Sequence, residues 1–207
     1  MGEGLRRREL LVRAGGLGLA ALVAEALPVA RALAQDPGIP LDPDGTLQAF
    51  ADTIVPGRKV ERTESGAAIH PQAIAGVDRL PGAVETDALA LYHHQKTGFD
   101  ALEPAFLADL TARAGGRPFL TLSFDERTAV CTAGLAFDNP VRVLWEAAAA
   151  VPFTAFCAAA MNEAQTAAKA AGYRVMGLPG RSDGYSTGRA SYGRKLARER
   201  TKRGYLG

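Results

Sequence analysis

The 207-residue chain has few of the residues from which active sites are usually built. It contains three histidines and two cysteines, and no C-x-x-C pair or other cysteine spacing typical of a metal site. A Walker A loop, a G-x-S-x-G nucleophile elbow and a C-x-x-C-H haem site are also missing. Because no catalytic constellation is evident, we expect a protein that is not itself an enzyme and that holds no cofactor or metal of its own.

The three histidines leave one alternative open. His93 and His94 are adjacent, and adjacent side chains on a helix point about 100° apart, so the two cannot readily share one metal ion. A site made from one of this pair, His70 and a carboxylate would make the protein a metalloenzyme. Surface or capping roles are the simpler interpretation, and we favour them.

The two cysteines, Cys131 and Cys157, lie in segments that we predict to be helical. An oxidising compartment would permit a disulfide between them if those helices pack together. They could equally be two buried thiols, since cysteine is among the most buried residue types. In a third alternative, one of them pairs with a partner chain. The sequence does not fix the geometry that a disulfide requires, so all three alternatives stand.

The N-terminus has the features of an export signal. Its first part resembles the twin-arginine motif, carried by Arg7, Arg8, Leu10 and Leu11. The apolar run that follows, Ala14–Ala24, is shorter than the roughly 20 residues that span a bilayer. Ala32 and Ala34 form a small-x-small cleavage pattern, so we predict a signal peptide over 1–34. The alternatives are a helix of the fold and a retained membrane anchor.

Such a signal predicts where the mature protein works. We expect export of the folded chain by the twin-arginine translocase, contact with the membrane only during export, and a periplasmic or extracellular location. Charge is divided unevenly in the remainder: residues 35–173 hold 10 Lys+Arg against 17 Asp+Glu, whereas residues 174–207 hold 9 against 2. An exported protein rarely meets nucleic acid, so we expect the basic tail to dock on an acidic protein surface. A merely solvated tail is the alternative.

Apolar periodicity predicts helices and no strands. Residues 35–45 read as a linker, and residues 46–172 as a compact all-α bundle of about six helices. A capping box, Ser123 to Glu126, marks one helix start, and Pro152 is expected to kink or split the longest helix. The expected helices cover residues 46–55, 71–80, 84–96, 99–114, 124–137 and 139–171, with an irregular surface loop over 58–70.

The last segment, residues 173–207, alternates glycine with tyrosine and arginine. We predict an extended tail with a short helix near residues 194–202. Extended segments of this kind can become ordered on a partner, and tyrosine and arginine are frequent interface anchors. The residues expected to bind a partner are Tyr185, Arg189, Tyr192, Arg194 and Tyr205.

Three short motifs, taken in order, carry a family resemblance. They are the helix Phe50-Ala-Asp-Thr-Ile-Val-Pro-Gly57, the segment Ala75-Gly-Val77, and Phe119-Leu-Thr-Leu-Ser-Phe-Asp-Glu-Arg127. With the export signal in front, residues 46–171 resemble the gluconate 2-dehydrogenase subunit 3 family, whose members carry "adxiiPg", "agv" and "Lsxxer" segments. The chain looks most similar to the actinobacterial relatives found with GMC-type (glucose–methanol–choline) flavin oxidoreductases.

The resemblance implies a small subunit without catalytic residues. Such subunits bind a flavin-dependent oxidoreductase chain that lacks its own signal, help it to mature and carry it out of the cell, so FAD is expected in the partner. The alternative function is that of a secreted α-helical binder of an apolar small molecule such as a sterol. In that case Trp145, Phe153 and Phe156 would line the pocket.

Overall fold

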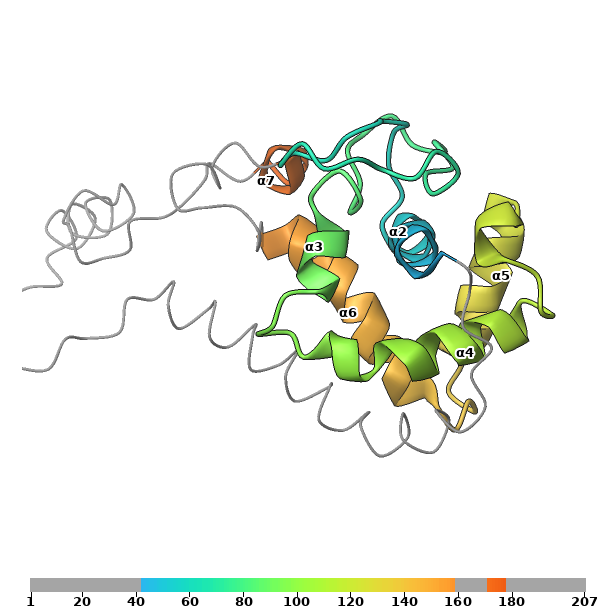
Figure 1. Ribbon diagram of the computed structural model, residues 1–207. Helices are drawn as coiled ribbons and strands as arrows, with labels where there is room; N and C mark the ends of the chain where they lie inside the picture. Colours follow the sequence, from blue (N-terminus) through green and yellow to red (C-terminus); the bar gives the residue numbers. More distant parts are fainter. Residues whose placement is uncertain (1–41, 159–170, 178–207) are drawn as a thin grey trace, which may run out of the picture.

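The computed structural model describes residues 42–158 and 171–177 of the chain (Figure 1). These residues form a compact helical arrangement without a sheet, which confirms the all-α prediction; the single β-bridge among them joins Arg62 and Ala68. The helices are α2 (Pro43–Ile54), α3 (Ala88–Tyr92), α4 (Glu103–Arg113), α5 (Phe124–Gly134), α6 (Arg142–Ala158) and α7 (Ala171–Val175), and two 3-10 turns are η1 (Phe99–Ala101) and η2 (Phe119–Thr121). Among the described helices, none has both the length and the apolar character that crossing a membrane requires.

Helix α2 lies at the centre, packed against α3, α5, α6 and η2 (Figure 1). It begins at Pro43, and the Asp42 carboxylate accepts a 2.9 Å hydrogen bond from the amide of Gly45. The helix therefore starts inside the segment 35–45 that we predicted as a linker. The reason is local, since a capping aspartate followed by proline at the first helical position is itself a helix start.

An aromatic cluster joins the central helix to its neighbours. Phe50 of α2, Phe106 of α4 and Trp145 of α6 are fully buried and meet edge to face, with ring centroids 4.8–5.9 Å apart. Tyr92 and Phe99 extend the cluster, with their ring centroids 4.8 Å apart. Such pairs contribute about 0.5–1.5 kcal/mol beyond the area they bury, so these rings fix how α2, α4 and α6 pack.

Helix α6 differs from its prediction at its start and near Pro152. It begins at Arg142, after a turn at Pro140 and Val141. The Asn139 side-chain oxygen accepts a 3.2 Å bond from the amide of Val141 and a 2.7 Å bond from Arg113, and its amide group donates to the carbonyl of Gly134. The helix then continues through Pro152 as one element as far as Ala158, so the proline does not split it.

The helix predicted over residues 71–80 is not formed. Ile74 is buried as expected, but Val77 and Leu80 are 54% and 52% exposed, and Gly76 has a φ of +72° that a helix does not allow. The helix predicted over 84–96 is reduced to α3. It cannot start earlier because Asp87 adopts a left-handed φ of 63° while its carboxylate binds the amide and hydroxyl of Ser65.

Candidate functional site

The segment between α2 and α3, residues 55–87, is the longest irregular stretch between the described helices, and we call it the α2–α3 loop (Figure 1). The carboxylate of Asp52, in the last turns of α2, binds two backbone amides of this loop. One carboxylate oxygen accepts a 2.8 Å bond from the amide of Ala75, and the other accepts a 3.3 Å bond from the amide of Gly57. Burial raises the pKa of Asp52, whereas these two amides and the charge of Arg127 act in the opposite direction.

The side chain of Arg127 in α5 binds backbone carbonyl groups of the same loop. Its guanidinium donates bonds of 2.8–2.9 Å to the carbonyl oxygens of Ala73 and Gln72 in the loop, and one of 2.8 Å to that of Leu120 in η2. Burial lowers the pKa of Arg127, while the charge of Asp52 raises it. The buried anion thus binds amide groups of the loop and the buried cation binds its carbonyl groups. We call Asp52, Arg127 and the backbone groups that they bind the Asp52–Arg127 clasp.

The two ends of the loop meet at a glycine pair. A Cβ added to Gly57 would lie 2.4 Å from the backbone nitrogen of Gly82, so only glycine permits this approach. Next to the pair, the amide of Ala83 donates to the carbonyl of Val55, and Arg58 forms a bidentate ion pair with Glu85 at 2.6 and 3.0 Å. The loop is therefore closed on itself at its base.

The far side of the loop reaches α7. The carboxylate of Glu64 accepts a 2.7 Å bond from the amide of Ala171, the first residue of that helix. Figure 1 shows α7 beside this part of the loop. Between these attachment points the loop presents Val77 and Leu80 to solvent, with 54% and 52% of their surface exposed.

The three motifs that carry the resemblance meet at this clasp. Asp52 and Gly57 belong to the first motif, Ala75 to the second, and Arg127 to the third. The capping box of the third motif is also formed, with Glu126 accepting a 2.8 Å bond from the amide of Ser123 and the Ser123 hydroxyl accepting from the amide of Glu126. Asp52 and Arg127 thus bind backbone groups of the α2–α3 loop and shape it, whereas the capping box starts α5.

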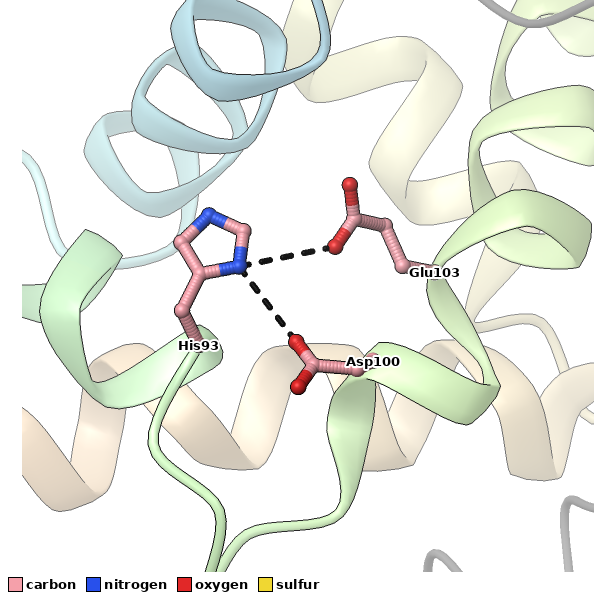
Figure 2. A group of neighbouring side chains, drawn as sticks. All are labelled: His93, Asp100 and Glu103. Atoms are coloured by element: carbon pink, nitrogen blue, oxygen red, sulfur yellow. Dashed lines mark hydrogen bonds and ion pairs between the residues drawn. The ribbon is translucent and has the colours of Figure 1, made fainter.

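A second polar cluster surrounds His93, at the end of α3 (Figure 2). Its Nδ1 atom lies 3.3 Å from a carboxylate oxygen of Asp100 in η1 and 3.7 Å from one of Glu103 at the start of α4. Its Nε2 atom lies 3.0 Å from a carboxylate oxygen of Asp44 in the first turn of α2. One imidazole is thus enclosed by three carboxylates from three helical elements.

The charges of this cluster act on one another. Burial alone lowers the pKa of His93, but its bonds to Asp44 and Asp100 and the charge of Glu103 outweigh burial, so the pKa is raised from its ordinary value of 6.5. Burial raises the pKa of Glu103, and the charges of Asp44 and Asp100 raise it further, against the opposing effect of His93. Sequence reasoning named His93 but missed the carboxylates, because Asp44 is distant in the chain and nothing local links the two.

The other two histidines do not join this cluster. The Nδ1 atom of His94 accepts a 3.2 Å bond from the amide of Lys96, in the turn that follows α3. His70 accepts at Nδ1 from the amide of Gln72, and its Nε2 atom lies 3.6 Å from Asp42. The combination of His70 with His93 or His94 in one site is therefore not formed.

The structure also shows where the two cysteines and the three predicted pocket residues lie. Both thiols are free, with Cys131 buried in α5 and Cys157 exposed on α6, so the structure does not form the bridge between them. Trp145 is fully buried in the aromatic cluster, where its indole nitrogen donates a 2.7 Å bond to Asp109. Phe156 is buried and Phe153 is half exposed, so the three predicted pocket residues have three different environments.

The remaining predicted residues lie outside the part of the chain that the structure describes. They are the export-signal residues Arg7, Arg8, Leu10, Leu11, Ala32 and Ala34 and the predicted partner contacts Tyr185, Arg189, Tyr192, Arg194 and Tyr205.

Comparison with known proteins gives a family and no function. No curated protein and no solved structure matches the chain. Residues 42–205, which include every described helix and most of the tail, match a family of unknown function. This match covers well over half of the 207 residues, and the chain therefore belongs to the family of unknown function DUF5987.

Proposed function

We propose that this protein is a non-catalytic small subunit that binds a flavin-dependent oxidoreductase of the GMC type, helps it to mature and is exported with it by the twin-arginine route. The single observation that carries the binding part is the α2–α3 loop. Its main chain is held by the buried Asp52–Arg127 clasp, while Val77 and Leu80 stay exposed. A loop whose shape is fixed in advance loses little conformational entropy when a partner covers it.

The export part of the proposal rests on the N-terminal sequence. Arg7 and Arg8 precede a short apolar run that is rich in glycine and alanine, a pattern that favours the route for folded proteins. The resemblance of the three motifs to gluconate 2-dehydrogenase subunit 3 supplies the class of partner, and FAD would be the cofactor of that partner. The basic tail, including Tyr185, Arg189 and Tyr192, would add a second contact with the partner's surface.

Co-purification tests the binding part. The full chain, with an affinity tag, is expressed together with a signal-less GMC-type oxidoreductase from the same genome, and the eluate is examined for the second chain and for flavin absorbance. We expect both in a fixed ratio. Elution of the tagged chain alone, without flavin, would overturn the proposal.

A matched pair of variants tests the surface. Val77→Asp together with Leu80→Asp should reduce recovery of the oxidoreductase about 10-fold or more, because a charge would have to be buried in the interface. Phe137→Asp is the control, since Phe137 is 90% exposed and belongs to the connection between α5 and α6 and not to the α2–α3 loop. Equal losses in the two variants would count against the loop as the binding surface. Thermal unfolding of each variant alone checks that the fold is intact.

Export has its own test. Replacement of Arg7 and Arg8 by lysine should leave both proteins in the cytoplasm, although only one of them carries the substitution. If the oxidoreductase still reaches the exterior in this strain, its export does not depend on the small subunit.

A further inference from the structure

The cluster around His93 brings together side chains of the kinds that bind metal ions. Both ring nitrogens lie near carboxylate oxygens, and Figure 2 shows the Nδ1 side. A neutral imidazole, which has one N–H group, can donate to only one of these sides, whereas a protonated ring can donate to both. The 3.0 Å distance from Nε2 to Asp44 is that of an ordinary hydrogen bond, whereas the 3.3 and 3.7 Å distances from Nδ1 to Asp100 and Glu103 are longer than the usual range. The contacts on the Nδ1 side are therefore the looser ones.

The distances on the Nδ1 side are close to those between ligand atoms of a metal site, with 3.3 Å to Asp100 and 3.7 Å to Glu103. With bonds of about 2.0–2.2 Å to nitrogen and oxygen, neighbouring ligand atoms in a tetrahedral zinc site lie roughly 3.3–3.5 Å apart. The ligand atoms of His93, Asp100 and Glu103 all lie within 4.8 Å of one another. The three side chains converge on one point from the end of α3, from η1 and from the start of α4 (Figure 2).

Asp44 fits the part of an outer partner. Histidines that bind metal commonly donate their other ring N–H group to a carboxylate, which fixes the tautomer and the ring orientation. With the proton on Nε2 and directed at Asp44, the lone pair of Nδ1 faces Asp100 and Glu103. Either a proton on Nδ1 or a bound cation would offset the repulsion between that lone pair and the two carboxylates.

The balance of charge points the same way. Within residues 42–158 and 171–177, the three carboxylates form ion pairs with His93 and with no lysine or arginine. The side chain of Glu103 is only 17% exposed, so its charge is costly unless a cation offsets it. Imidazole together with carboxylates favours a first-row transition-metal ion over calcium or magnesium, which prefer oxygen ligands alone.

We propose that His93, Asp100 and Glu103 bind a divalent transition-metal ion such as Zn²⁺, with Asp44 as the outer partner of the imidazole and water completing the shell. The ion would join the end of α3 to the start of α4, next to the first turn of α2. Bound metal would stabilise the native fold because the site does not exist in the unfolded chain. The residues of this site lie outside the α2–α3 loop, so a test of the metal site does not depend on whether the proposed function is correct.

Titration of the tag-free full chain with Zn²⁺ tests the proposal, after treatment with a chelator and with calorimetry and thermal unfolding as readouts. We expect one ion per chain and a rise in Tm. His93→Gln and Glu103→Gln should each remove the binding, and Asp44→Asn should weaken it about 10–100-fold. His94→Gln is the matched control, because it changes the adjacent imidazole at the same helix end, and it should bind as the wild type does.

Several outcomes would overturn the metal site. They are no saturable Zn²⁺ binding by the wild type, binding retained in His93→Gln, or equal losses in His93→Gln and His94→Gln. Binding of Ca²⁺ that survives in His93→Gln, in place of Zn²⁺ binding, would show a carboxylate cluster only and would also refute it. Affinity for Zn²⁺ should fall as the pH is lowered through the raised pKa of His93, because protons compete with the metal for the imidazole. An affinity independent of pH would contradict the role of the imidazole. Unfolding curves without metal confirm that each variant folds.

Discussion

The hydroxyl of Tyr92 donates a 2.8 Å hydrogen bond to the carbonyl oxygen of Ala148, four residues before Pro152. In an α-helix that carbonyl would bond the amide of residue 152, but proline has no N–H group. A side chain from α3 therefore supplies the donor that α6 lacks. Burial raises the pKa of Tyr92 well above 10, so the phenol keeps its proton and remains a donor.

This relationship predicts a coupling between two substitutions. Tyr92→Phe should lower the free energy of unfolding by about 1–3 kcal/mol, because it leaves a buried carbonyl without a partner. In a Pro152→Ala background the restored amide can bond Ala148, and the same Tyr92→Phe change should cost clearly less. Urea unfolding of the four proteins measures the coupling. Equal costs in both backgrounds would show that the hydroxyl does not replace the missing amide.

A second prediction concerns Arg127. Arg127→Met should destabilise the protein by at least about 2 kcal/mol, because three carbonyl groups lose a charged donor and Asp52 loses its counter-charge. Hydrogen exchange should become faster at the amides of Gly57 and Ala75, which bond Asp52. Arg117→Met is the control, since Arg117 is largely exposed and pairs with Glu126 on the surface, where such pairs contribute less than about 1 kcal/mol. A similar small effect of both changes would contradict the clasp.

Thiol reactivity should separate the two cysteines. Burial raises the pKa of Cys131 to about 12, and it leaves that thiol both shielded and protonated, whereas Cys157 is exposed. An Ellman assay should therefore detect one thiol in the native protein and two in urea. Cys157→Ser should leave none reactive in the native state. Failure to detect any thiol in urea without a reductant would show that the two are bridged after all.

The capping box of α5 should make the free energy of unfolding depend on pH. The amide of Ser123, the side chain of Arg117 and the hydroxyl of Ser123 lower the pKa of Glu126 from 4.5 to about 2. Because the folded state lowers this pKa, the stabilisation is complete above about pH 4.5 and is lost as the pH falls through about 2. Glu126→Gln keeps a capping side chain that does not titrate. The stability difference between wild type and variant should shrink over this pH range, and a constant difference would exclude the linkage.

The sequence predicted the fold best where one helix carries its own signals. Leu102, Phe106 and Leu110 lie on one apolar stripe and are buried, and the Ser123–Glu126 box starts α5 as expected. It failed over residues 71–80, where the apolar spacing is helical but Asp52 and Arg127 bind the backbone groups that a helix would have used. These partners come from distant parts of the chain, so tertiary bonds override a local preference.

The candidate sites show the same limit. The sequence marks His93 as one of three histidines. Its partners Asp44, Asp100 and Glu103 become neighbours only when α2, α3 and α4 are packed together. The motif around Asp52 was noticed as a family resemblance, and its physical role became clear only from the amides that its carboxylate binds.

The Asp52–Arg127 clasp recognises main-chain atoms and no side chain of the α2–α3 loop. Every residue other than proline offers the same amide and carbonyl groups, so substitutions at outward-facing positions such as Val77 and Leu80 leave the clasp unchanged. Within a family that keeps the clasp, the surface presented by the loop can therefore diverge while its backbone shape is retained. Different members could in this way acquire different specificities on one constant frame.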